Sequence, residues 1–156
     1  MTQQVSHETF TGLLNMLLEE TFSKVEGIYL DGGTSLFETL DTISAGAASR
    51  PITPDGTTIA SQVGHVRFYL TVMEDYIQGK WYEKVDWQGS WKPKTVTPEE
   101  WDALKQDLRD THERVVDLIK SFDEWNDERK LGGALGILTH TAYHLGAIRQ
   151  IIRVVR

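Results

Sequence analysis

Two histidines near the C-terminus, His140 and His144, stand four residues apart in the segment HTAYHLGAIRQ, residues 140–150. On a helix, side chains at this spacing project from adjacent turns on one side, with Cβ atoms about 5–6 Å apart. Two imidazoles placed in this way can bind one metal cation together. The alternative is a pair of core histidines that are kept neutral and satisfied by local hydrogen bonds. The spacing alone leaves both interpretations open.

Two well-known helical metal motifs do not fit this pair. A zinc-protease helix carries H-E-x-x-H, whereas Thr141, Ala142 and Tyr143 separate the histidines here. Di-iron bundles use Glu-x-x-His pairs, and no glutamate lies three residues before a central histidine. A third ligand would therefore have to come from another helix. His65 is the best candidate, whereas His112, in the charged stretch RDTHER, and His7, near the N-terminus, are expected at the surface.

The composition excludes several classes of function. The chain has 156 residues and no cysteine, so disulfides, thiolate metal sites and a protein thiol nucleophile are all excluded. The formal net charge is −7, and no basic block supplies the electrostatic footprint of a nucleic-acid-binding protein. No run approaches the roughly 18 apolar residues of a membrane span. The first residues lack the basic and apolar regions of a secretory signal, so we expect a cytoplasmic protein without nucleic-acid or membrane partners.

The apolar periodicity predicts an all-α fold in one domain, residues 1–156. Long amphipathic helices are predicted over 6–30, 58–77, 98–122 and 131–154, with a shorter one from Ser35 towards Pro51. Capping boxes at Ser35 with Glu38 and at Thr97 with Glu100 mark two of the starts. Residues 79–96 show no period and predict a long, tryptophan-rich loop. Four long helices favour a four-helix bundle with an additional short helix between the first and second long helices.

The last helix is apolar on two sides. One stripe comprises Leu135, Leu138, Ala142, Leu145 and Ile152, and the other comprises Ile137, Ile148, Ile151 and Val155. A helix that is apolar on most of its surface requires burial on more than one side. Gly132, Gly133, Gly136 and Gly146 allow close backbone approach along it. These features indicate either a homodimer contact through this helix or the central helix of the bundle.

Two segments together resemble the DinB-like (DinB/YfiT) superfamily. They are LTHTAYHLGAIRQII in the last helix and IASQVGHVRFYL in the second long helix. The short-helix segment SLFETLDTISAGAASRPI, the tryptophan-rich loop and TPEEW also look like that family, so the resemblance covers nearly the whole chain. It implies a four-helix bundle, usually dimeric, with a metal triad at His65, His140 and His144. Imidazole ligands suit zinc, nickel, iron or copper, and zinc or nickel is the ion we expect.

The resemblance also implies a type of chemistry, because characterised relatives include transferases and isomerases that use low-molecular-weight thiols. We therefore expect a metal-dependent enzyme of the thiol S-transferase type, acting on a small-molecule substrate. The alternatives are a non-catalytic metal-stabilised helical dimer and a metal-dependent hydrolase. Arg67 and Arg149 are candidate cations for an anionic thiol. Gln62, one turn before His65, either orients a bound ligand or water or is a polar residue of the core.

Overall fold

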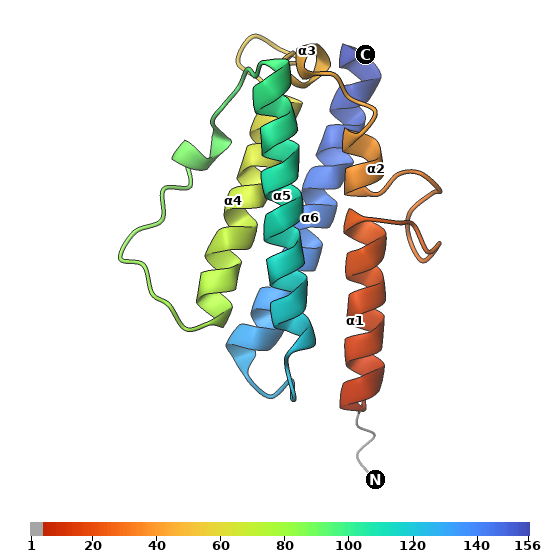
Figure 1. The fold of residues 1–156 in the computed structure, drawn as a ribbon, viewed down its shortest axis with the longest axis vertical. Helices are drawn as coiled ribbons and strands as arrows, with labels where there is room; N and C mark the ends of the chain where they lie inside the picture. The colour runs from red at the N-terminus through yellow and green to blue at the C-terminus, as the bar shows by residue number, and fades with distance from the viewer. Residues whose placement is uncertain (1–4) are drawn as a thin grey trace.

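The computed structural model describes residues 5–156, which contain helices and no strand. Four long helices form the bundle (Figure 1). Short helices occupy two of the connections. The long helices are α1 (His7–Phe22), α4 (Ile59–Ile77), α5 (Pro98–Lys120) and α6 (Glu128–Val155); the short ones are α2 (Leu36–Leu40), α3 (Ala45–Ala48) and the 3₁₀ turn η1 (Gly89–Trp91).

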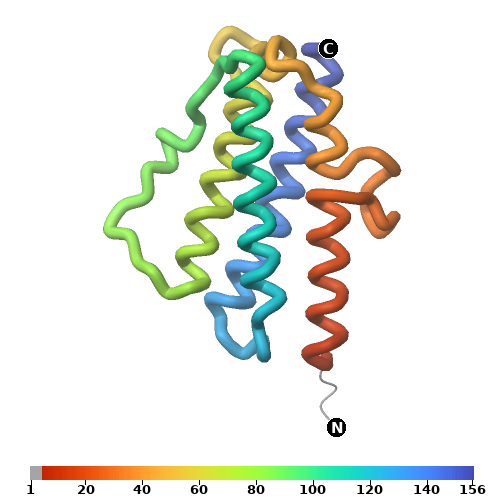
Figure 2. The backbone as a smooth tube through the Cα atoms, in the orientation of Figure 1, coloured from red at the N-terminus to blue at the C-terminus, as the bar shows by residue number. Residues whose placement is uncertain are grey.

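Helix α4 packs against α5 and α6. Helix α1 also packs against α5 and α6, on the side away from α4. In Figure 1, α1 and α6 run towards the end of the bundle where the C-terminus lies, whereas α4 and α5 run the opposite way. Two consecutive parallel helices need a connection that returns along the full length of the bundle. The segment 78–97 makes this return beside α4 and carries η1, as the backbone tube in Figure 2 shows.

Side-chain caps fix where the long helices begin. Thr97 accepts a hydrogen bond from the backbone N–H of Glu100, whose carboxylate accepts one from the N–H of Thr97. Thr58 caps α4 in the same way, with Ser61 as its reciprocal partner. Each such cap contributes about 1 kcal/mol. Ser35 and Glu38 form the same reciprocal pair at the start of α2, so the capping boxes predicted at Ser35 and Thr97 are confirmed.

The first helix ends earlier than its apolar period predicts, at Phe22 instead of near residue 30. The fully buried Glu20 explains this difference. Its carboxylate accepts hydrogen bonds from the backbone N–H groups of Ile28, Tyr29 and Leu30, at 2.7–2.9 Å, which folds the segment back onto the helix. The turn uses Gly27 at φ 86°, a conformation that favours glycine.

The segment after Ser35 forms two short helices, α2 and α3, instead of one helix running to Pro51. Helix α2 ends at its C-cap Asp41, and Ser44 then caps a new start by accepting from the N–H of Ala47. The predicted single helix is wrong here because a second N-cap interrupts it.

Two of the α6 glycines allow α4 to approach closely. A Cβ on Gly133 would lie 2.5 Å from Cγ1 of Ile77, and one on Gly136 would lie 2.9 Å from the hydroxyl of Tyr69. At Gly132 and Gly146 the same atom would meet open space.

The apolar stripe of α6 that starts at Ile137 is buried, whereas Leu135 on the other stripe is 39% exposed. Along residues 5–156, no helix has the length and apolar character needed to cross a membrane.

Candidate metal centre

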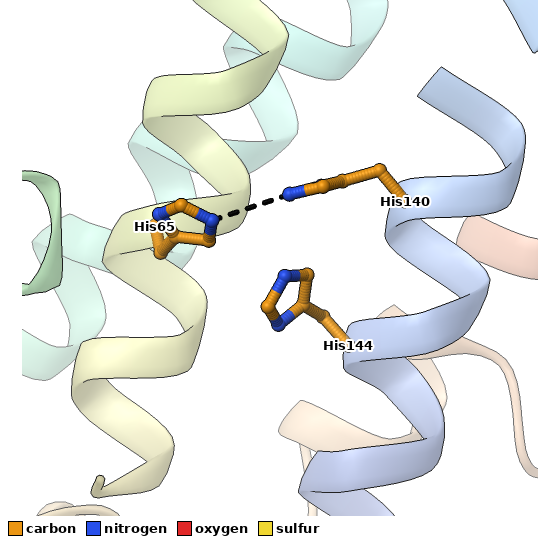
Figure 3. A group of neighbouring side chains, drawn as sticks. All are labelled: His65, His140 and His144. Carbon is orange, nitrogen blue, oxygen red and sulfur yellow. Dashed lines mark hydrogen bonds between the residues drawn. The ribbon is translucent and has the colours of Figure 1, made fainter. Parts of the chain in front are cut away.

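Three histidines meet in the contact between α4 and α6. His65 lies in the middle of α4, and His140 and His144 lie one turn apart on α6, with all three rings turned towards one another (Figure 3). The Nε2 atoms of His65 and His140 are 3.2 Å apart. One ligand nitrogen from each ring lies within 4.8 Å of the other two. Within residues 5–156, no carboxylate belongs to this group.

Burial keeps the three imidazoles neutral. Burial, followed by the proximity of His144 and His65, lowers the pKa of His140 to about 3. The pKa of His144 falls to about 4 through burial and the proximity of His65, and burial lowers the pKa of His65 as well. Charged imidazolium is disfavoured in such surroundings. At neutral pH each ring therefore keeps a lone pair for a cation.

Polar side chains bind the outer nitrogens of two of the rings. Nδ1 of His65 lies 2.7 Å from Oγ of Ser90, which is in η1. Nδ1 of His144 lies 2.6 Å from Oε1 of Gln62, one turn before His65 on α4. Metal-binding histidines nearly always have such an outer partner, which fixes the orientation of the ring. Nδ1 of His140 is buried and has no partner.

Aromatic rings surround the histidine cluster. Trp91 stacks on His65, with ring centroids 4.1 Å apart and planes inclined by 9°. Trp87 meets His65 edge-on at 6.3 Å. Tyr143 is 74% exposed beside His144, with ring centroids 5.0 Å apart. Trp81 belongs to the same loop but is 86% exposed, so only part of the tryptophan-rich loop covers the cluster.

A glycine beside His65 lets the loop come this close. A Cβ at Gly64 would lie 3.1 Å from the backbone oxygen of Lys92 and 3.6 Å from that of Ser90. A side chain at this position would push the loop away from α4. Gly64 therefore helps to bring Ser90 and Trp91 to His65.

The donor set fits a divalent transition metal. Nitrogen ligands suit zinc, nickel, copper and iron, whereas calcium and magnesium prefer oxygen. Two imidazole nitrogens at about 2.0–2.1 Å from one tetrahedral zinc lie roughly 3.3–3.4 Å apart. The 3.2 Å separation of the Nε2 atoms of His65 and His140 is close to that value. The three histidines that the family resemblance implies as ligands are thus brought together.

The candidate cations lie elsewhere. Arg67 forms an ion pair with Asp107 of α5, with Nε and Oδ2 2.5 Å apart. Arg149 donates to the hydroxyl of Thr39 in the short helix α2. Neither arginine is therefore engaged with the histidine cluster.

His112 is half-buried and not the solvated surface residue that was expected. Its ring packs between Phe22 and Phe37, with centroid distances of 4.3 and 5.3 Å, and its Nε2 is buried without a partner. The charged neighbours in sequence point to solvent, whereas His112 itself faces α1 and α2. His7 is exposed as expected, although its Nε2 contacts the backbone oxygen of Phe122 at 3.1 Å.

Sequence reasoning missed Ser90 and assigned Gln62 only in part. The expectation for Gln62 is that it orients a bound ligand or water, or fills the core; in the structure its carbonyl oxygen contacts His144 on the opposite helix. Ser90 lies 25 residues beyond His65 in a loop without periodicity, so no pattern in the sequence pointed to it.

Comparison with known families gives one match. A model described as the DinB superfamily matches residues 31–148, which include all three histidines and both outer partners. Comparisons with curated proteins and with solved structures find no match to the chain.

Proposed function

Because this chain belongs to the DinB superfamily, we propose that it binds one divalent transition-metal ion, zinc or nickel, through His65, His140 and His144 and that it is an enzyme. The proposed activity is the transfer of a low-molecular-weight thiol to a small electrophile. One observation carries this proposal: three neutral imidazoles converge on one point, and no carboxylate joins them in the described chain. Three protein ligands are typical of catalytic sites, because they leave a coordination position for water or substrate.

The chain contains no cysteine, so the thiol of such a reaction comes from outside the chain. A divalent ion in this site would supply Lewis acidity, which lowers the pKa of a thiol or water bound to it. In the proposed reaction, a bond forms between the thiol sulfur and a carbon of the electrophile. The leaving group departs with the electron pair of the bond that breaks, and the thiol proton is released to solvent.

The chain's own residues would contribute positioning and exclusion of water. The lowered pKa values keep the histidines as unprotonated ligands at neutral pH. Trp91 covers one face of His65. Trp87 and Tyr143 remain partly exposed beside the cluster and offer aromatic surface to a substrate.

Metal analysis of the untagged protein tests the first part of this proposal. We expect near-stoichiometric zinc or nickel by mass spectrometry, and its loss in His65→Ala and His144→Ala. The matched control is His7→Ala, which removes an exposed histidine far from the cluster and should retain the metal. A folded parent that neither contains metal nor takes it up on reconstitution would contradict the proposal.

A thiol screen tests the second part. The metal-loaded protein is incubated with an alkylating electrophile and each of several small thiols, and the conjugate is quantified. We expect turnover that disappears after chelation and in His144→Ala. Metal binding without turnover for any thiol would favour the second candidate, a non-catalytic site. That candidate is supported by the ligands' origin in two helices, because a shared ion would tie α4 to α6.

We also propose that the chain forms a homodimer through the outer face of α1 and α6, which pack side by side. Apolar side chains are exposed on both helices: Leu13 and Met16 on α1, and Leu135 on α6. The space beside Gly146 is open to a second helix. Light scattering on the eluting protein should give twice the chain mass, and Leu135→Glu should give the mass of one chain.

A further inference from the structure

The three histidines differ in what holds their outer nitrogens, and this difference determines where each ring carries its proton. A neutral imidazole has one N–H and one lone pair, and only the nitrogen with the lone pair can bind a metal. The hydrogen-bond partners of the outer nitrogens therefore decide which rings are ready to act as ligands through Nε2.

Ser90 fixes the tautomer of His65. The hydroxyl of Ser90 donates its one proton to the backbone oxygen of Trp87, at 2.6 Å. Towards Nδ1 of His65, at 2.7 Å, the same oxygen can then only accept. Nδ1 of His65 must carry the proton, and its Nε2 presents a lone pair to the centre of the cluster.

Gln62 fixes the tautomer of His144 by the same logic. Its amide nitrogen donates to the hydroxyl oxygen of Thr57, at 3.0 Å. The carbonyl oxygen of Gln62 accepts from Nδ1 of His144 at 2.6 Å. His144 therefore carries its proton on Nδ1 and also presents Nε2 as a lone pair.

His140 is left with the opposite tautomer. The contact between Nε2 of His65 and Nε2 of His140 needs one proton, and His65 holds its own proton on Nδ1. Nε2 of His140 is thus the donor. Its buried Nδ1 carries no proton and has no hydrogen-bond partner. To bind a metal through Nε2, His140 must place its proton on Nδ1. That N–H has no partner there, and leaving a buried donor unpaired is unfavourable.

We propose that Ser90 and Gln62 are positioning residues that hold His65 and His144 as preset metal ligands, and that His140 is the exchangeable third ligand, which changes tautomer when the ion binds. This inference rests on the proposed function, since it presumes a metal bound by the three histidines. Neither Ser90 nor Gln62 touches the ion itself; each acts through one imidazole.

Nuclear magnetic resonance of ¹⁵N-histidine-labelled, metal-free protein reads the tautomers directly. We expect His65 and His144 as Nδ1–H tautomers and His140 as the Nε2–H tautomer. Ser90→Ala should change the tautomer signals of His65, and Gln62→Met those of His144. A loss of folding alone would not separate the two rings in this way.

Metal affinity gives the second readout, by competition with a chromophoric chelator. Loss of an outer partner typically weakens metal binding about 10–100-fold, which is what we expect for Ser90→Ala and Gln62→Met. Gln62→Glu retains an acceptor for His144 and should restore most of the affinity. The absorption bands of the cobalt-loaded protein should shift in the two weakened variants and return in Gln62→Glu.

Two control variants remove matching groups away from the histidines. Ser49→Ala deletes a hydroxyl that binds the backbone N–H of Val96 and so anchors the same loop without touching a histidine. Gln106→Met replaces a glutamine of α5 that pairs with Asp110. Both should keep the affinity of the parent, and circular dichroism confirms that every variant is folded.

The outcomes separate the two proposals. If the parent binds metal and both weakened variants bind it within twofold of the parent, the positioning role is overturned while the metal site stands. Nε2–H tautomers for His65 and His144 in the parent would also overturn the positioning role. If the folded parent binds no metal, the proposed function fails, and the inference that rests on it fails too.

Discussion

Tyr69 of α4 lies flat against His140 of α6, with ring centroids 3.6 Å apart and planes inclined by only 8°. The phenol hydroxyl reaches the backbone of α6 at Gly136, where a Cβ would lie 2.9 Å from it. His140, the one ring of the cluster without an outer hydrogen-bond partner, is therefore held by stacking. That stacking depends on Gly136, one turn before His140.

Gly136→Ala should weaken metal binding several-fold, because the new methyl group displaces Tyr69 from the face of His140. Chelator competition measures the affinity. Gly132→Ala is the matched control on the same helix, because its Cβ would meet nothing within 4 Å. That control should keep the affinity and gain up to about 1 kcal/mol of stability from helix propensity. Equal affinities in the two variants would refute the role of the stacking.

Removing the metal should lower the melting temperature, since an ion that binds only the folded chain stabilises it. At a free metal concentration about 100 times Kd, the stabilisation is about 2.7 kcal/mol, or roughly 5–10 °C for a chain of this size. Scanning calorimetry with and without a chelator measures this change. His144→Ala should show no shift on chelation, and a shift as large as that of the parent would place the metal elsewhere.

The half-buried His112 should make the stability of the metal-free protein depend on pH. Burial, followed by the positive charges of Lys120 and Arg109, lowers the pKa of His112 to about 4. The unfolded chain, in which histidine has a pKa of about 6.5, therefore binds this proton first as the pH falls. The contribution of neutral His112 to the free energy of unfolding is therefore fully present above a pH of about 6.5, and it is lost as the pH falls towards about 4.

The variant His112→Phe isolates this contribution. The free energy of unfolding, measured with urea from pH 7.5 to pH 4, should fall less steeply in the variant, by up to about 3 kcal/mol at the acid end. The carboxylates that line the same groove are unchanged in both proteins, so their titration largely cancels in the difference. They are Glu19, Glu38, Asp41, Glu113 and Asp117. Parallel curves for the two proteins would show that His112 does not titrate in this way.

Periodicity and caps suffice to predict the long helices, because those signals are local to the chain. The start of α5 at Pro98 follows from the Thr97 cap alone. The end of α1 does not, because it depends on the side chain of Glu20 binding N–H groups eight to ten residues later. The partial burial of His112 likewise depends on a contact with Phe37 of α2. The charged residues beside His112 in the sequence give no sign of that contact.

In the candidate site too, some residues can be found from local sequence signals and others only from the tertiary structure. His140 and His144 are recognisable by their spacing on one helix, and His65 joins them through the family resemblance. Their outer partners are a matter of tertiary packing. Gln62 bonds across the helix contact to His144, and Ser90 reaches His65 only because the loop folds back along α4. Nothing in the local sequence encodes that return.

Gly64→Ala tests whether the close approach of this loop matters for the site. The added methyl group would lie 3.1 Å from the backbone oxygen of Lys92. The atoms nearest to it all belong to the backbone, so no side chain can rotate away to relieve the contact. The loop must move outward by a few tenths of an ångström, which lengthens the hydrogen bond from His65 to Ser90. We therefore expect metal affinity to fall, but by less than in Ser90→Ala. Combining the two substitutions should add little, because both act on the same contact. Fully additive losses in the double variant would show that Gly64 acts on the site by another route, independent of Ser90.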